Sequence, residues 1–358
     1  MIVADRLLAT FLDLVRISSP SGQEGAVAQA LMDRLRALGL APQRDEAGNV
    51  WAMLDGQGEP LLLTAHMDTV SPGENVRPVV RDGVVYSDGT TVLGADDKSG
   101  VAIILEVLEA LREAGAAHRP LDVLFTVAEE TGLQGAKAFD TGRLRARLGV
   151  GLDAHGEQGT IVVQAPAQNA IHVRVHGRMA HAGVNPQDGI NAIRVAAEAI
   201  AAMPLGRIDE ETTANIGVIS GGTATNIVPD LVSLRGEARS RQEAKLDEQT
   251  RRMVAALEER AAAHGATAEI DVRRAYSAFT LTEDDAVVGL VSDAMRTVGV
   301  EPLLLPSGGG SDANVLNAGG VPTVQISTGM EAVHTCDEHI AVADMAQAAE
   351  IVGACVRV

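Results

Sequence analysis

Short apolar runs alternate with helical patterns in the first and last parts of this chain of 358 residues. In the helical stretches the apolar residues recur every three or four positions, as Val101, Ile104 and Leu108 do. This alternation predicts an α/β fold with a mixed, mostly parallel sheet flanked by helices, because parallel neighbours need a crossover connection. The expected strands lie at 50–54, 61–65, 121–127, 148–153, 303–305 and 321–326.

The alternation is interrupted once, near Gln168. There "AIHVRVHG" alternates apolar and polar residues, which indicates a strand with one exposed face. The elements expected after it are a helix at 189–203, strands at 213–220 and 231–238, a helix at 242–264 and a strand at 267–273. This β-α-β-β-α-β order predicts a ferredoxin-like α+β unit. We therefore expect an inserted domain at 168–275 and a first domain formed by 1–167 and 276–358.

Charge and composition exclude several classes of function. The formal net charge of −19 argues against nucleic acid as a partner, since phosphate binding needs a basic surface. No window approaches the ~20 consecutive apolar residues of a membrane span. The N-terminal segment is interrupted by Asp5, Arg6, Asp13 and Arg16, which favours an amphipathic helix over a signal peptide. The two cysteines, Cys336 and Cys355, lack the close spacing of a zinc knuckle or a redox motif, which fits free thiols and a cytoplasmic location.

Acidic residues and histidines follow several of the predicted strands. His66 and Asp68 end the strand that begins at Leu61, and their spacing places both side chains on one face. The other members of this set are Asp96 and Asp97 before a helix, Glu129 and Glu130 after a strand, Asp153 at a strand end, and His334 near the C-terminus. Ligands of open α/β sheets bind at the carboxyl ends of the strands. We therefore expect these side chains to converge at one edge.

Each of these residues also has a purely structural interpretation. The Asp96–Asp97 pair could cap a helix, the two glutamates could be solvated, and His334 could be a hydrogen-bonded bystander. Several buried carboxylates together are costly, however, unless cations compensate their charge. Histidine and carboxylate ligands without thiolates are typical of catalytic zinc, with cobalt and manganese as alternatives. The occurrence of several carboxylates and histidines at the same edge of the predicted sheet favours a metal site.

Several short motifs of the chain resemble those of a known family. The motifs are "HMD" at 66–68, "GADDKSG" at 94–100, "EETG" at 129–132, "GLDAHG" at 151–156 and "VHTCDEH" at 333–339. The chain is similar to the co-catalytic dizinc peptidases that include peptidase T, carboxypeptidase G, aminoacylase and succinyl-diaminopimelate desuccinylase. The resemblance extends over essentially the whole chain, and the "GADDK" motif is closest to the peptidase T-like branch.

The resemblance implies a role for each of these residues. Two divalent cations, zinc above all, are expected to be held by His66, Asp96, Glu130, Asp153 and His334, with Asp96 bridging them. Asp68 would orient His66, and Glu129 would act as the general base. The peptide bond between Asp96 and Asp97 is expected to be cis.

The resemblance also implies substrate-facing residues in and near the inserted domain. His181 in "GRMAHAG" would contact the oxyanion, often from the partner subunit of a homodimer that the inserted domain forms. Asn226, Arg239, Gly309 and Gly310 would line the substrate site. His181 could instead be a surface histidine, and Arg239 a salt-bridge partner. A serine nucleophile in "GGGSD" is disfavoured because the G-x-S-x-G pattern is missing.

Three functions are compatible with these residues. The first is a metal-dependent exopeptidase, an aminopeptidase or tripeptidase of small peptides. The second keeps the same dizinc centre in an amidohydrolase, deacylase or carboxypeptidase acting on N-acyl amino acids or C-terminal amide bonds. The third is a non-catalytic metal-binding protein, which is disfavoured because every expected ligand and the base are present. The sequence leaves the exact substrate, the native metal and the oligomeric state undetermined.

Overall fold

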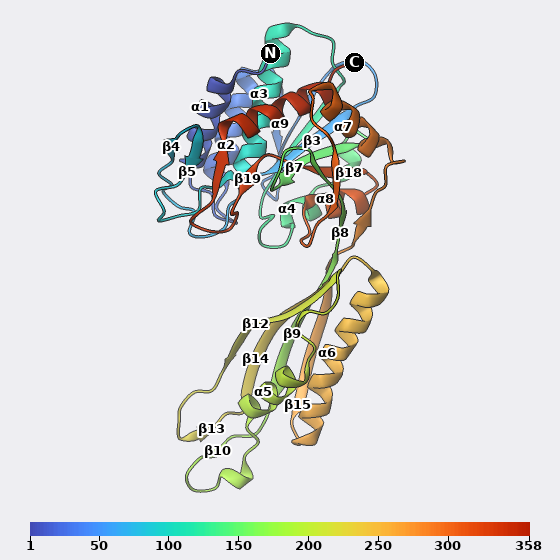
Figure 1. The fold of residues 1–358 in the computed structure, drawn as a ribbon. Helices are drawn as coiled ribbons and strands as arrows, with labels where there is room; N and C mark the ends of the chain where they lie inside the picture. The colour runs from blue at the N-terminus through green and yellow to red at the C-terminus, as the bar shows by residue number, and fades with distance from the viewer. The chain divides into compact units, whose positions relative to one another are not determined.

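The structure is a computed structural model that describes residues 1–358. Its chain forms two compact units (Figure 1). The first contains residues 1–164, 280–307 and 311–358, and the second contains residues 165–279 and 308–310. The second unit includes the whole range 168–275, in which the sequence pattern changes. No helix is both long enough and apolar enough to cross a bilayer.

The first unit is built on a nine-stranded sheet in the order β1-β2-β6-β3-β7-β18-β8-β16, with β17 also paired to β8. The strands are β1 (Gln43–Arg44), β2 (Val50–Leu54), β3 (Leu61–His66), β6 (Leu121–Thr126), β7 (Gly149–Ala154), β8 (Thr160–Ala165), β16 (Phe279–Thr280), β17 (Leu303–Pro306) and β18 (Thr323–Ser327). The four neighbours β6, β3, β7 and β18 are parallel. β2 runs antiparallel to β6 and β8 antiparallel to β18, while β17 runs parallel to β8. The mostly parallel sheet is as the sequence predicts.

Helices cover both faces of this sheet. They are α1 (Ala4–Val15), α2 (Gly25–Ala37), α3 (Ala95–Ala114), α4 (Gln134–Ala138), α7 (Ala286–Thr297), α8 (Asp312–Ala318) and α9 (Val342–Cys355), with a 3-10 turn at Thr141–Arg143. α3, most of whose residues are buried, packs on β3 and β7, and α1 and α9 pack on α3 (Figure 1). α8 lies against β7 and β18. Leu62 and Leu124 of the sheet form a buried cluster with Phe139, which follows α4, and with Leu316 of α8.

A smaller sheet lies in the same unit, in the order β19-β20-β5-β4. Its strands are β4 (Val79–Arg81), β5 (Val84–Tyr86), β19 (Met330–Glu331) and β20 (His339–Ala341). The hairpin β4-β5 lies in the Gly- and Pro-rich segment at 71–94. The sheet brings the loop after β19, which carries His334, to the segment that precedes α3.

The second unit is an antiparallel sheet in the order β11-β12-β14-β9-β15, with α5 and α6 packed together on one face (Figure 1). Its elements are β9 (Ala167–His176), β10 (Ala180–His181), α5 (Ala192–Ala202), β11 (Gly206–Arg207), β12 (Thr212–Gly221), β13 (Ile227–Val228), β14 (Leu231–Ser240), α6 (Glu243–Ala263) and β15 (Thr267–Tyr276), with a 3-10 turn at Pro186–Asp188. Ile171, Val173 and Val175 of β9 are buried, and the residues between them are more exposed. This is the alternation read from the sequence, in a ferredoxin-like order.

Sequence analysis missed several elements of the first unit, including β8 and α8. β8 has only three consecutive apolar residues, Ile161 to Val163, and two of them are half-buried, so its signal is weak. α8 is seven residues long, too short for helical periodicity to be visible. Both matter for the site, since α8 begins at a buried aspartate, Asp312.

Candidate metal centre

Asp96 lies between two imidazoles. One of its carboxylate oxygens, Oδ1, is 2.9 Å from Nε2 of His66, which ends β3 and is almost fully buried. The other oxygen, Oδ2, is 3.1 Å from Nε2 of His334. Each oxygen therefore faces a different histidine, which is the arrangement that a bridging carboxylate needs.

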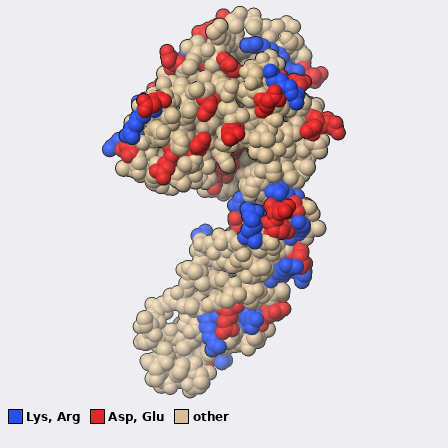
Figure 2. All heavy atoms as spheres, viewed as in Figure 1, with Lys and Arg blue, Asp and Glu red and all other residues tan.

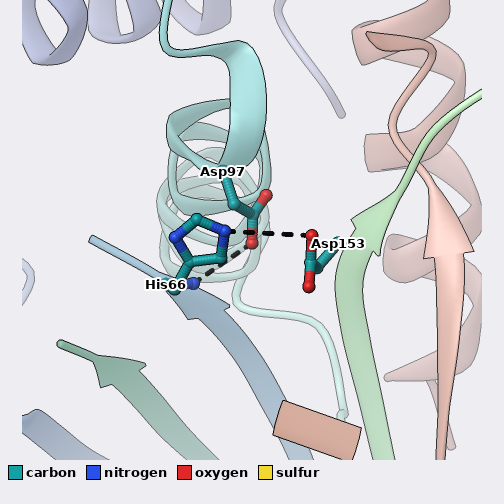
Figure 3. Close-up of side chains that lie close together, drawn as sticks. All are labelled: His66, Asp97 and Asp153. Atoms are coloured by element: carbon teal, nitrogen blue, oxygen red, sulfur yellow. Dashed lines mark hydrogen bonds and ion pairs between the residues drawn. The ribbon is translucent and has the colours of Figure 1, made fainter. Parts of the chain in front are cut away.

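Two further carboxylates complete this cluster. Oε1 of Glu130 is 3.0 Å from Nε2 of His334, and Oδ1 of Asp153 is 3.8 Å from Nε2 of His66 (Figure 3). The ligand atoms of His66, Asp96 and Glu130 all lie within 4.8 Å of one another. The structure thus brings together all five residues that the sequence analysis assigns to the metals, from strands, loops and the start of α3. Asp96 and His334 among them are 238 residues apart.

Asp97 is also close, and the sequence analysis did not assign it a role. Its ligand atoms lie within 4.8 Å of those of His66 and Asp153 (Figure 3). Both of its oxygens already accept backbone hydrogen bonds, Oδ2 from the N–H of His66 and Oδ1 from that of Gly100, each at 3.1 Å. A Cβ at Gly100 would lie 2.4 Å from Oδ1, so this contact requires glycine. We infer that Asp97 fastens the end of β3 to α3. The peptide between Asp96 and Asp97 is cis, as the resemblance implied.

Asp68 is fully buried and links three parts of the cluster. Its Oδ1 lies 3.4 Å from Nδ1 of His66 and accepts the N–H of Glu129 at 3.0 Å. Its Oδ2 accepts the N–H of Glu130 at 3.2 Å and the hydroxyl of Ser21 at 2.6 Å. Burial opposes its ionisation, but hydrogen bonds from His66 and Ser21 outweigh this and hold the pKa of Asp68 below its usual range. Nδ1 of His66 also lies 3.1 Å from the backbone carbonyl oxygen of Asp68, so the carboxylate and the carbonyl of Asp68 both face this nitrogen while Nε2 faces Asp96.

The electrostatics of the cluster fit divalent cations. Burial, followed by the neighbouring carboxylates, raises the pKa values of Asp97 and Asp153 well above their usual range. Hydrogen bonds that His334 donates to the carboxylates of Asp96 and Glu130 raise its pKa to about 10. Carboxylates that repel one another around two imidazoles bind a positive charge tightly, whether a proton or a metal ion. The donor set of imidazole nitrogen and carboxylate oxygen, without thiolate, suits zinc.

Glu129 is buried at this site, 8% exposed, and no hydrogen bond joins its carboxylate to the imidazoles of His66 and His334. Burial, and then the charge of Asp153, raises its pKa well above its usual range. Such a carboxylate holds a proton more strongly than a solvated one, as a general base requires.

Asp312 is a second residue that the sequence analysis missed. It is 4% exposed, its Oδ2 accepts the hydroxyl of Thr126 at 2.5 Å, and its Oδ1 has no hydrogen-bond partner. Burial raises the pKa of Asp312 to about 6, and its charge in turn raises that of Glu129. The motif "SGGGSDA" contained the signal, but only its glycines were assigned a role.

The remaining predicted residues belong to the second unit. His181 ends β10 and is exposed, with its Nδ1 accepting the N–H of Gly183 at 3.1 Å. Asn226 is exposed directly before β13. The guanidinium of Arg239 in β14 donates to Glu237 twice, at 2.9 and 3.0 Å. Gly309 and Gly310 group with this unit, and a Cβ at Gly310 would lie 2.3 Å from the Tyr276 ring. Their roles toward a substrate stay predictions.

Comparison with known proteins agrees with this geometry. The model of peptidase family M20/M25/M40 matches residues 62–357. The uncharacterized protein YqjE of Bacillus subtilis (strain 168) is 43% identical to the chain, and the match covers 98% of each.

Solved structures resemble the chain over its whole length. The crystal structure of aminopeptidase PepT from Bacillus cereus ATCC 10987 is 42% identical with a TM-score of 0.88, covering 99% of this chain and 98% of that one. A tripeptidase from Staphylococcus aureus subsp. aureus mu50 is 41% identical with a TM-score of 0.94, covering 100% and 98%. The chain therefore belongs to peptidase family M20/M25/M40, in its peptidase T-like branch.

Proposed function

We propose that this chain is a metal-dependent exopeptidase that removes residues from small peptides, with an aminopeptidase or tripeptidase specificity. The observation that carries the proposal is Asp96, whose two carboxylate oxygens face the Nε2 atoms of two different histidines. The names of the two similar structures, an aminopeptidase and a tripeptidase, support the specificity. The alternative, hydrolysis of N-acyl amino acids or C-terminal amide bonds, has less support from these relatives.

The proposed cofactor is a pair of divalent cations, with zinc as the ion that the donors favour and cobalt or manganese as substitutes. His66, Asp153 and Asp96 would hold one ion, and His334, Glu130 and Asp96 the other. When bound, the ions supply Lewis acidity that polarises the scissile carbonyl and acidifies water.

Glu129 is the proposed general base. Its carboxylate oxygen would take a proton from the attacking water and later give it to the leaving amine. The N–H groups of both Glu129 and Glu130 are held by Asp68, so the base and the neighbouring ligand have a common anchor. The two adjacent side chains are proposed to have different roles: Glu129 takes the proton of water, and Glu130 binds a cation.

Residues of the second unit are proposed to complete the site. His181 would donate to the oxygen on which negative charge develops. Asn226, Arg239, Gly309 and Gly310 would bind the substrate, with the Arg239 guanidinium oriented by Glu237. His181→Ala should lower kcat, and Arg239→Ala should raise KM. If kcat and KM are unchanged in both variants, these two assignments are wrong.

A free tripeptide and its N-acetylated form separate the two candidate specificities. An aminopeptidase should release the N-terminal residue of the free peptide and turn over the blocked form with a kcat/KM at least about 100-fold lower, because a site that pairs with the amine rejects its acyl derivative. The products, identified by chromatography, provide the control, since an aminopeptidase leaves a C-terminal dipeptide. Preference for the acetylated peptide would favour the deacylase or carboxypeptidase alternative.

A homodimer formed by the second unit is proposed from its exposed apolar residues. On β12 and α5 these include Val218, Ile219 and Ile193, which are 40%, 53% and 42% exposed. β11 pairs with only the first part of β12, so the remainder of β12 is an unpaired edge. The end of this unit near β10 and β13 shows few charges on the face drawn in Figure 2.

Sedimentation analysis tests the dimer. We expect the parent to sediment as a dimer at micromolar concentration and Ile219→Lys to shift it toward the monomer, because a charge on the paired edge must be desolvated. Ile200→Val, a change away from this edge on the packed side of α5, is the control. A monomeric parent would contradict the proposal.

A cytoplasmic location is also proposed. Cys336 and Cys355 are both free thiols, which is usual in a reducing compartment. Fractionation that recovers the protein only outside the cytoplasm would contradict this assignment.

A further inference from the structure

Glu338 is a buried carboxylate that no part of the proposed reaction uses. Its side chain is 1% exposed, and its oxygens accept two backbone hydrogen bonds from the turn before α3. Oε2 accepts the N–H of Gly94 at 2.7 Å, and Oε1 accepts the N–H of Asp96 at 2.9 Å. Both oxygens are therefore occupied by the backbone of the segment that carries Asp96.

The turn before α3 needs such a partner. Gly94 has a φ of +76°, which lies in the left-handed region, and no side chain of the turn itself caps the helix. Asp96 and Asp97 have non-helical backbone angles, so the first N–H groups of α3 have no intrahelical acceptors. Glu338 supplies the acceptors from 242 to 244 residues away.

The other end of Glu338 is attached to the loop that carries His334. This loop is closed on itself by a bond from the Thr335 hydroxyl to the carbonyl of Ala332 at 2.7 Å and one from the N–H of Glu338 to the carbonyl of Thr335 at 3.2 Å. His334 has a φ of +63° and a side chain that is 51% exposed. Glu338 is thus a single side chain that connects the backbones of Asp96 and His334.

The two histidines differ in how they are supported. His66 is buried, and both Asp68 and Asp97 hold it. The loop of His334 has, besides Glu338, a 3.4 Å bond from the Ser87 hydroxyl to the carbonyl of Cys336. Loss of Glu338 should therefore disturb His334 more than His66.

We propose that Glu338 is a positioning residue that sets the spacing between Asp96 and His334 and so controls the affinity of the cation that these two residues share with Glu130. Glu338 does not touch that cation or the substrate. It acts by holding the backbone from which the bridging Asp96 side chain extends. The inference rests on the proposed function, since it concerns the same metal centre.

Glu338→Gln tests this role because it keeps the shape of the side chain but replaces one acceptor oxygen with an NH2 group that faces a backbone donor. Asp122→Asn is the matched control. Asp122 is also buried, and its Oδ2 accepts two backbone N–H groups, from Arg145 at 2.6 Å and Ala146 at 2.8 Å. It lies at the far end of β6 from Glu129. Glu338→Asp, which keeps the charge and shortens the reach by one methylene, is the second variant.

Metal-free proteins are titrated with zinc by calorimetry, and their unfolding temperatures are compared. We expect the parent and Asp122→Asn to bind two equivalents. Glu338→Gln should bind the first equivalent as the parent does and the second about 10-fold or more weakly, with Glu338→Asp intermediate. At saturating zinc, the kcat of Glu338→Gln for a tripeptide should fall by a larger factor than its KM changes.

The outcomes separate the two proposals. Two parent-like zinc equivalents in Glu338→Gln, or in Glu338→Asp if the Gln variant does not fold, would overturn the role of Glu338 alone. Equal weakening in Glu338→Gln and Asp122→Asn would also overturn it, since the effect would then be a general loss of stability. A parent that binds no zinc would contradict the proposed function itself.

Discussion

Glu129→Gln is expected to keep both cations and to lower kcat about 10²–10⁴-fold, the range that a positioned proton-transfer group contributes. The amide cannot accept the proton of the attacking water. The variant should fold normally, because burial and the charge of Asp153 raise the pKa of Glu129, so a neutral side chain fits that environment. The measurement is kcat for a free tripeptide together with zinc content by elemental analysis.

Glu130→Gln is the matched neighbour. Glu130 lies 3.0 Å from the His334 imidazole, so its loss should weaken cation binding as well as activity. The two variants differ by one position in the chain and are expected to separate catalysis from metal binding. If Glu129→Gln hydrolyses the tripeptide as fast as the parent, Glu129 is not the base.

Asp96→Ala is expected to have the second large effect, the loss of tight binding of both cations and of at least about a thousandfold in kcat/KM, because Lewis-acid stabilisation is worth several kcal/mol. The physical reason is the position of Asp96, each of whose oxygens faces a different imidazole. Elemental analysis and tripeptide hydrolysis measure the two losses.

The parent after exhaustive chelation is the reference for Asp96→Ala. Chelation should abolish hydrolysis, and added zinc should restore it in the parent but not in the variant. Asp122→Asn should respond as the parent does. Full turnover by a chelated parent that contains no metal would show that the cluster of His66, Asp96 and His334 is not a catalytic metal centre.

The residues that sequence analysis missed share a physical property. Asp97, Asp312 and Glu338 are buried carboxylates whose hydrogen-bond partners are backbone N–H groups or a hydroxyl. The residue type shows that a carboxylate can accept a hydrogen bond. It does not show which distant backbone N–H group lacks another partner. The left-handed turn at Gly94 creates that need, and only the folded chain shows that Glu338 meets it.

The sequence by itself determined the order of most strands and helices and the carboxylates and histidines at the strand ends. Periodicity and turn residues are local properties, and the motif around Asp96 is contiguous, so both can be read from neighbouring residues. Only the tertiary structure decided which oxygen of Asp96 faces which histidine and which buried acid supports the turn. The contacts of Asp96 with His334 and with Glu338 join residues more than 200 positions apart, and their geometry depends on how the sheets and loops pack.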